Sequence, residues 1–130
     1  MPQHIALITY LVRDYDEAMR WFDAALAFKL FEDTDMGDGK RWVVMGPDSE
    51  RGARFLLARA ANPEQAAAVG KAAGGRVAYF LHTDDFARDH AKMLAAVVPF
   101  IESPRRESYG TVAVFEDLYG NRWDLLQPET

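Results

Sequence analysis

The sequence contains no cysteine. Disulfide frameworks, thiol nucleophiles and cysteine-ligated zinc sites are therefore excluded. Positive charge is also scarce, because 15 Lys and Arg residues stand against 20 Asp and Glu residues and the formal net charge is −5. Binding to a phosphate backbone requires a dense basic face, so nucleic acid is not an expected partner.

Long apolar runs are missing as well. The N-terminal segment MPQHIALITYLV is apolar, but it lacks a basic n-region and a cleavage site. No run approaches the roughly 20 residues of a membrane-spanning helix, so we expect a cytoplasmic protein without membrane association. The 130 residues, of which 49% are apolar and 27% charged, suit one compact domain with a substantial core.

The first half of the chain predicts one strand, one helix and three further strands. HIALITYLV at 4–12 is nearly continuous in β-branched and aliphatic residues, which is typical of a buried strand. Asp14 and Glu17 form a D-x-x-E helix start, and apolar residues then recur at helical spacing, which predicts a helix over 14–27. Three short strands joined by turn signals follow, in FKLFED, RWVVMG and ARFLLARA.

The second half repeats this order after a short Ala-rich helical segment and Gly74-Gly75. Asp84 starts a predicted helix over 84–97. The predicted strands are RVAYFLHT at 76–83, VPFIES at 98–103, GTVAVFE at 110–116 and NRWDLLQ at 121–127.

An offset of 70 residues aligns the two halves. Leu11 then matches Leu81, and Asp14 matches Asp84. This internal repeat predicts two βαβββ modules, about 3–61 and about 75–128, within a single domain over 1–130. Each module is too thin to stand alone. We therefore predict an α+β fold in which the modules form one curved eight-stranded mixed sheet, with helices on the outer face and a concave inner face.

Two segments carry a resemblance to a known family. VRDYDEAMRWFDAALAF lies near the start, and FEDLYGNRWDLLQ near the end contains the pattern D-x-x-G-N-x-[FWIL]-[DE]-L at 117–125. With this layout the chain resembles the vicinal oxygen chelate superfamily, which includes glyoxalase I, extradiol dioxygenases and bleomycin-binding proteins. The resemblance covers essentially the whole chain. It implies the paired-module fold and a homodimer, whereas activity varies widely within such a fold.

The resemblance also implies where a metal would bind. Metal-dependent members take two ligands from each module, and the four positions fall on Leu7, at or next to Leu57, within one residue of Ala78, and on Asp124. Leucine and alanine cannot bind a metal, and divalent cations need three or more protein donors. We therefore expect no metal and no cofactor, with Asp124 the one residue that matches a ligand position.

Strand alternation extends this set to a candidate ligand pocket. If the four positions face the concave side, their neighbours two residues away do so too. Trp42 and Val44, or else Arg41 and Val43, then line the third strand, with Val112 and Val114 as their counterparts in the second module. The predicted ligand-binding residues are Leu7, Thr9, Phe55, Leu57, Arg59, Ala78, Phe80, His82, Arg122 and Asp124. Such a cavity is mostly apolar with a few polar groups, as expected for an organic ligand. The alternative is that aliphatic side chains fill it.

His82 and Asp124 are the candidate catalytic residues. His82 is either a partly exposed residue at a strand end or a general base. Asp124 is either paired with Arg59 or Arg122, or it binds a ligand, transfers a proton or holds a metal.

Three functions remain open. The first is a protein that binds a small organic molecule without a metal. The second is an enzyme of the glyoxalase or dioxygenase type (a lyase, isomerase or dioxygenase) with an atypical metal site or with metal-free acid–base chemistry. The third is a non-catalytic structural module with a filled cavity. The missing ligands favour the first over the second.

Overall fold

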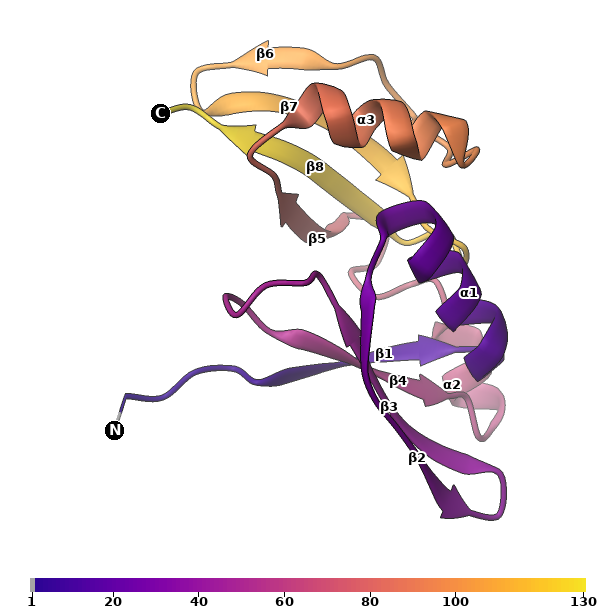
Figure 1. The fold of residues 1–130 in the computed structure, drawn as a ribbon. Helices are drawn as coiled ribbons and strands as arrows, with labels where there is room; N and C mark the ends of the chain where they lie inside the picture. Colours follow the sequence, from indigo (N-terminus) through magenta and orange to yellow (C-terminus); the bar gives the residue numbers. More distant parts are fainter. Residues whose placement is uncertain (1) are drawn as a thin grey trace. The chain divides into compact units, whose positions relative to one another are not determined.

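The computed structural model describes residues 2–130, which form two compact units, Met1–Val69 and Gly70–Thr130. Each unit contains one βαβββ module (Figure 1). The strands hydrogen-bond as two four-stranded mixed sheets, with the orders β1-β4-β3-β2 and β5-β8-β7-β6. The predicted α+β class and the two modules are confirmed. The strand pairing closes one sheet within each module, where the sequence analysis expected a single eight-stranded sheet.

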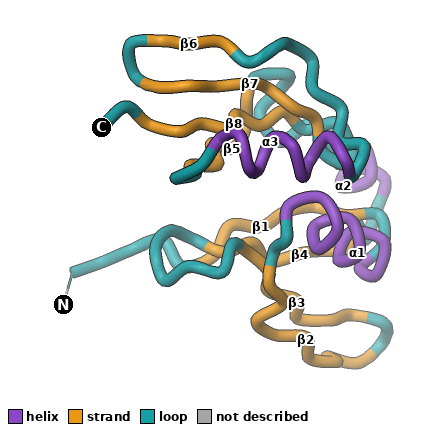
Figure 2. The backbone as a smooth tube through the Cα atoms, turned by 45° about the horizontal axis from the view of Figure 1, so that its top comes forward, coloured by secondary structure: helices purple, strands orange, loops and turns teal. Residues whose placement is uncertain are grey.

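The elements follow the predicted order along the chain, as the tube in Figure 2 shows. The first unit contains β1 (Leu7–Val12), α1 (Tyr15–Leu26), β2 (Lys29–Gly37), β3 (Lys40–Gly46), β4 (Arg54–Arg59) and α2 (Pro63–Ala68). The second unit contains β5 (Val77–His82), α3 (Phe86–Ala95), β6 (Arg105–Glu107), β7 (Gly110–Glu116) and β8 (Arg122–Pro128). In residues 2–130, no helix is both long and apolar enough to cross a membrane.

Helix α1 begins where the D-x-x-E pattern predicts. The Asp14 side chain accepts a hydrogen bond from the backbone N–H of Glu17 at 2.8 Å, which satisfies one of the free donors at the helix start. Ala27 ends the helix in the left-handed conformation, with φ 54°, and its N–H bonds to the carbonyl of Asp23.

An aromatic cluster holds α1 against one face of the first sheet. The ring of Phe22 stacks on Phe28 with centroids 5.2 Å apart and meets the edge of Tyr10 at the same distance. Phe55 of β4 lies 6.0 Å from Phe22 and 6.4 Å from Phe28. The helix-covered face of this sheet therefore contains Tyr10 and Phe55.

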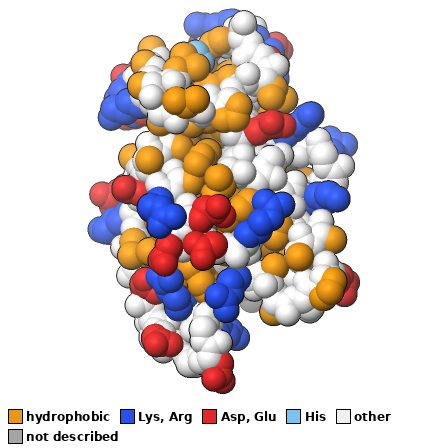
Figure 3. All heavy atoms as spheres, turned by 90° about the vertical axis from the view of Figure 1, so that its right-hand side faces the viewer, with side chains coloured by type: hydrophobic (Ala, Val, Ile, Leu, Met, Phe, Trp, Pro, Cys, Tyr) orange, Lys and Arg blue, Asp and Glu red, His pale blue; other side chains and the backbone are white. Residues whose placement is uncertain are grey.

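Arg41 of β3 ties α1 to the first sheet from the solvent side. Its guanidinium bonds to Asp33 at 2.7 Å and to Asp16 of α1 at 3.0 Å. On the face shown in Figure 3, acidic and basic side chains are interspersed, as such pairs require. The hydrogen bond from Arg41 holds the pKa of the Asp33 carboxyl below its usual range.

The helix of the second unit starts one residue later than predicted. Asp85, not Asp84, caps α3 by accepting the backbone N–H of Arg88 at 3.0 Å. Asp84 lies outside the helix and forms an exposed ion pair with Arg88 at 3.0 Å. The two adjacent aspartates are indistinguishable by pattern, and the backbone geometry selects the second.

The turn between β7 and β8 is organised by Asp117, which is buried. Its carboxylate accepts bonds from the backbone N–H groups of Tyr119 and Asn121, the amide of Asn121 at 3.1 Å, and the indole N–H of Trp123 at 2.9 Å. The sequence analysis assigned Asp117 to turn chemistry, and these bonds support that role. The most specific part of the family pattern is thus a structural turn.

The strand predicted over 98–103 is wrong. This segment forms an isolated β-bridge between Phe100 and Phe115 in place of a strand. A strand of three residues, β6, follows at Arg105–Glu107. Phe100 packs between His90 and Phe115, with centroid distances of 4.6 and 5.5 Å. The apolar pattern of segment 98–103 therefore reflects packing against α3 and the sheet.

Candidate functional site

The second sheet has a helix-covered face and an open face. Tyr79 and Phe115 pack on Trp123, with ring centroids 4.8 and 5.6 Å away, and these rings lie on the face that α3 covers. Successive residues of a strand point to opposite faces. Phe80, paired with Asp124, and Val114, which also pairs with Asp124, therefore share the open face.

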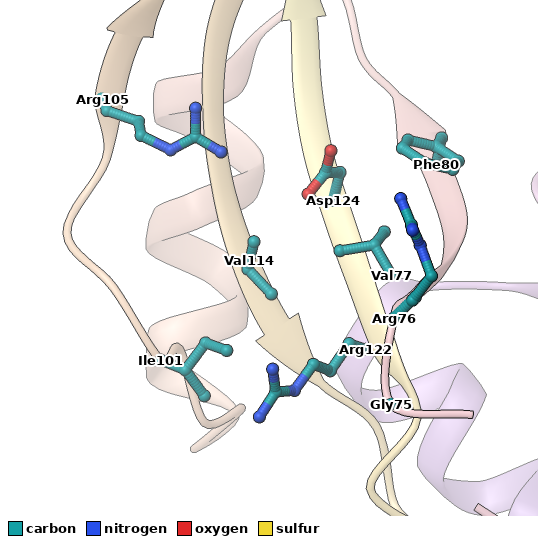
Figure 4. Close-up of a pocket in the computed structure, with 9 residues that line it drawn as sticks. All are labelled: Gly75, Arg76, Val77, Phe80, Ile101, Arg105, Val114, Arg122 and Asp124. Carbon is teal, nitrogen blue, oxygen red and sulfur yellow. The ribbon is translucent and has the colours of Figure 1, made fainter. Parts of the chain in front are cut away.

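A pocket of about 480 Å³ lies on this open face. Its walls come from β5, β6, β7 and β8 and from the segments before β5 and before β6 (Figure 4). The lining residues are Gly75, Arg76, Val77, Phe80, Ile101, Arg105, Val114, Arg122 and Asp124. All of them belong to the second unit, and the volume lies in the range of small-molecule sites.

Asp124 lies on β8 between Arg105 and Phe80 in Figure 4, and its side chain is only 9% exposed. Its Oδ1 atom is buried and has no hydrogen-bond partner within residues 2–130. Burial raises the pKa of the Asp124 carboxyl; the charge of Arg105 lowers it in part, and Glu102 raises it. A buried carboxylate without a partner costs folding free energy. Asp124 therefore presents the pocket with a hydrogen-bond acceptor that a ligand could use.

Within the second unit, the predicted pairing of Asp124 with Arg122 is not formed. Arg122 instead has a contact with Glu116, with Nε and Oε2 3.7 Å apart. The guanidinium of Arg59 lies 5.5 Å from the ring centre of Tyr15, in the first unit. Within the second unit, Asp124 is therefore not the acidic half of a structural ion pair.

The three pocket arginines differ in how far they are already engaged. Arg105 bonds to Glu102 at 3.1 Å and to Glu107 at 3.3 Å. Arg122 has the single contact at 3.7 Å, which is longer than a hydrogen bond, and its side chain is 47% exposed. The exposed side chain of Arg76 forms no ion pair with residues 2–130. Arg76 and Arg122 therefore have donors to spare.

The apolar part of the wall is partly open to solvent. The Phe80 side chain is 62% exposed and Ile101 46% exposed, although both are large and apolar. Val114 is buried, at 8%. Exposed apolar side chains gathered at a concavity mark a site for a ligand more often than single surface residues do.

The other predicted residues of β5 lie apart from the pocket wall. A register shift between Val77 and Tyr79 makes Ala78 the extra residue of a bulge, and Val77 lines the pocket in its place. His82 is exposed at the end of β5, pairs with Leu126 and is not a lining residue.

In the first sheet the predicted residues of β1 and those of β4 lie on opposite faces. Leu7 and Thr9 are exposed and lie opposite the face that contains Tyr10. Phe55 and Leu57, in contrast, pair with Ile8 and Tyr10 and share the helix-covered face.

Arg59 has the same parity as Phe55 and Leu57 and contacts Tyr15 of α1. The residues of β4 on the open face are Arg54, Leu56 and Ala58. The prediction was wrong by one residue because the alternation was anchored on Leu57. In β3, Trp42 and Val44 take the open face, because Arg41 contacts α1.

The residues do not fit the metal that the superfamily implies. The matching positions carry Leu7, Leu56 or Leu57, Val77 or Ala78, and Asp124, so Asp124 is the one donor among them. In residues 2–130, no three His, Asp or Glu side chains gather in a way that could hold a metal ion. A divalent cation held by one carboxylate would lack the donors it needs.

Five pocket residues escaped the sequence analysis: Gly75, Arg76, Val77, Ile101 and Arg105. Two of them precede β5, and Ile101 lies in the segment wrongly predicted as a strand. Arg105 starts a strand of three residues, which is too short to show alternation. Nothing in the sequence pattern separates these arginines from those on the surface.

Comparisons with known proteins find relatives that match nearly the whole chain. The chain is 52% identical over 128 residues to an uncharacterized protein of Shewanella frigidimarina (strain NCIMB 400), covering 98% of this chain and 95% of the relative. It is 26% identical over 124 residues to the uncharacterized protein YurT of Bacillus subtilis (strain 168), covering 95% and 98%.

Two solved structures share the fold over nearly the full length. The crystal structure of UcmS2 matches with a TM-score of 0.81 and 27% identity, over 97% of this chain and 98% of that one. TnmS3, an antibiotic binding protein from Streptomyces sp. CB03234, matches with a TM-score of 0.76 and 24% identity, over 98% of each chain. Residues 3–125 match the sequence model of a whole family, and the chain therefore belongs to the Glyoxalase/Bleomycin resistance protein/Dioxygenase superfamily.

Proposed function

We propose that this protein binds a small organic molecule in the pocket on the open face of the second sheet. The observation that carries the proposal is the pocket itself, with about 480 Å³ of space and a lining that combines apolar side chains with three arginines and one aspartate. The unpaired carboxylate of Asp124 adds support, because a ligand can supply the partner that the chain does not.

The relatives make such a role reasonable for this fold. TnmS3 is described as an antibiotic binding protein, so this architecture is able to hold organic molecules. At 24% identity the likeness shows the fold alone. The kind of ligand must therefore be inferred from the residues that line this pocket, not from TnmS3.

We infer that binding needs no metal. The donor set described above offers a cation one carboxylate, so the ligand meets arginines, Asp124 and apolar side chains directly. A chelator added before titration is expected to leave the affinity unchanged. An affinity that disappears with chelator and returns with nickel, zinc or manganese would contradict this part of the proposal.

Titration with the fluorescent aromatic anion anilinonaphthalene sulfonate tests the site. We expect one dye per chain and a blue-shifted emission. Ile101→Trp fills the pocket from a position that is 46% exposed, so the fold should survive and binding should be lost. The control is Leu94→Trp, which adds the same ring to α3 at a position 52% exposed and outside the pocket. Equal binding by both variants would place the dye elsewhere.

The resemblance to the superfamily also implies a homodimer, and we propose this assembly with one pocket per chain. Light scattering coupled to size exclusion should then give about twice the 14.7 kDa of one chain. A mass of one chain at micromolar concentration would overturn the dimer and leave the pocket unaffected.

A further inference from the structure

We propose that the pocket selects a planar aromatic acid that carries a hydroxyl group, with the anionic group on Arg122 and the hydroxyl on the Asp124 carboxyl. The inference rests on the proposed function and names the ligand class of the same site. Three observations carry it: the spare guanidinium donors, the unpaired buried acceptor and the exposed aromatic ring at the wall.

The anionic group follows from the charge of the lining. Three arginines and one aspartate line the pocket, so positive charge is in excess there although the whole chain is acidic. Arg105 is already engaged by Glu102 and Glu107, whereas Arg122 keeps free donors and extends toward Ile101 at the pocket wall (Figure 4). Arg76 also keeps free donors, but its side chain extends toward Phe80 on the other side of the pocket. A guanidinium matches the geometry of a carboxylate with two parallel hydrogen bonds.

The hydroxyl follows from Asp124. This side chain is 9% exposed, lines the pocket and has an oxygen without a partner in the described chain. A ligand hydroxyl can donate to the ionised carboxylate and can also accept from the protonated acid, so it suits either form. An ammonium group would also pair with the carboxylate, but it would be repelled by the arginines around it.

The planar ring follows from the walls. Phe80 presents a 62% exposed ring on one side, and Val77, Val114 and Ile101 supply aliphatic surface on the other parts of the wall (Figure 4). Aromatic rings stack with offset faces, and guanidinium planes stack on aromatic faces as well. A flat ring therefore uses this wall better than a flexible chain of equal size.

The test compares three matched probes by isothermal titration calorimetry: para-hydroxycinnamate, cinnamate, and the methyl ester of para-hydroxycinnamate. Cinnamate lacks the hydroxyl, and the ester lacks the negative charge. We expect para-hydroxycinnamate to bind about tenfold more tightly than either of the other two, since each lost charge-assisted hydrogen bond is worth about that factor.

Variants assign each advantage to a residue. Asp124→Leu, which is apolar and of similar size, should abolish the advantage of the hydroxyl, and Asp124→Asn should reduce it while preserving the shape. Arg122→Gln should reduce the advantage of the free acid over the ester. Arg106→Gln is the matched control, because Arg106 lies on β6, pairs with exposed Glu129 and does not line the pocket.

Each outcome decides between the two proposals. Equal affinity for para-hydroxycinnamate and cinnamate, both blocked by Ile101→Trp, would overturn the ligand class and leave the binding function standing. An advantage of the hydroxyl that persists in Asp124→Leu would overturn the role of Asp124. If neither the dye nor any of the three probes binds, the binding function fails as well.

Discussion

Replacing Asp124 by asparagine should make the ligand-free protein more stable at neutral pH. The substitution keeps the shape of the side chain and removes its charge. In the folded chain the carboxylate is 9% exposed, and its Oδ1 receives no hydrogen bond from residues 2–130. Burial therefore raises the pKa of Asp124, with Arg105 opposing and Glu102 adding to the rise.

The sign of the pH dependence follows from this direction. Between the ordinary pKa of an unfolded aspartate and the raised pKa of Asp124, the folded chain holds more protons than the unfolded one. Stability contributed by the protonated form is complete below the unfolded pKa and is lost as the pH rises through the folded pKa. The unfolding free energy gained by Asp124→Asn should thus be near zero at the acid end and reach its full value at neutral pH.

The size of the effect follows from the cost of an unsatisfied buried group. That cost is about 1–3 kcal/mol, and an amide at the same place keeps part of it, so we expect a gain of about 1 kcal/mol above the folded pKa. For a chain of this length this corresponds to a rise in Tm of roughly 3–5 °C. Urea unfolding and thermal melts over a series of pH values measure both quantities.

Asp48→Asn is the control for this experiment, because Asp48 is 78% exposed and its contact with Lys29 is 3.8 Å long. Its unfolding free energy should change by less than about 0.5 kcal/mol at every pH. A clear loss of stability in Asp124→Asn at neutral pH would refute the reasoning, since it would mean that the charge of Asp124 is paired in solution.

Three further predictions concern the fold. Asp117→Ala leaves several buried donors without an acceptor and should lower the unfolding free energy by about 3 kcal/mol in urea, whereas Asp84→Ala, at 87% exposure, should change it by less than about 0.5 kcal/mol. Gly110→Ala drives a Cβ into a carbonyl oxygen of the neighbouring strand and should lower Tm more than Gly120→Ala, which has open space; an equal shift would contradict the clash. Arg41→Met breaks two partly exposed ion pairs and should cost about 1 kcal/mol, less in high salt; a salt-independent loss would indicate packing instead.

The expected behaviour of Asp124 links stability to binding. Asparagine should make the apo protein more stable and at the same time weaken its preference for a hydroxylated ligand. Such a trade-off is typical of residues that are held unsatisfied for a function. A variant that gains stability without any change in ligand preference would separate the two roles.

Local chemistry made much of the fold predictable. The carboxylate of Asp14 three residues before Glu17 caps a helix wherever apolar residues follow at helical spacing, and α1 begins there. The turn at 117–121 needs an acceptor for closely spaced N–H groups, and Asp117 supplies it. The repeat at an offset of 70 predicted the two modules, because β1 and β5, like β3 and β7, keep that spacing.

The sequence by itself therefore determined the order of the elements, the cap of α1, the turn at Asp117 and the family to which the chain belongs. Only the tertiary structure decided which side chains meet. The alternation of side chains along a strand predicts that Phe55 and Leu57 share a face of the sheet, but packing against α1 decides which face it is. The bulge at Ala78 brings Val77 to the pocket, and Arg76 and Arg105 arrive there from segments without any pattern. The physical reason is that capping and periodicity act within a few residues, whereas strand register, and with it the unpaired state of Asp124, depends on contacts between segments far apart in the chain.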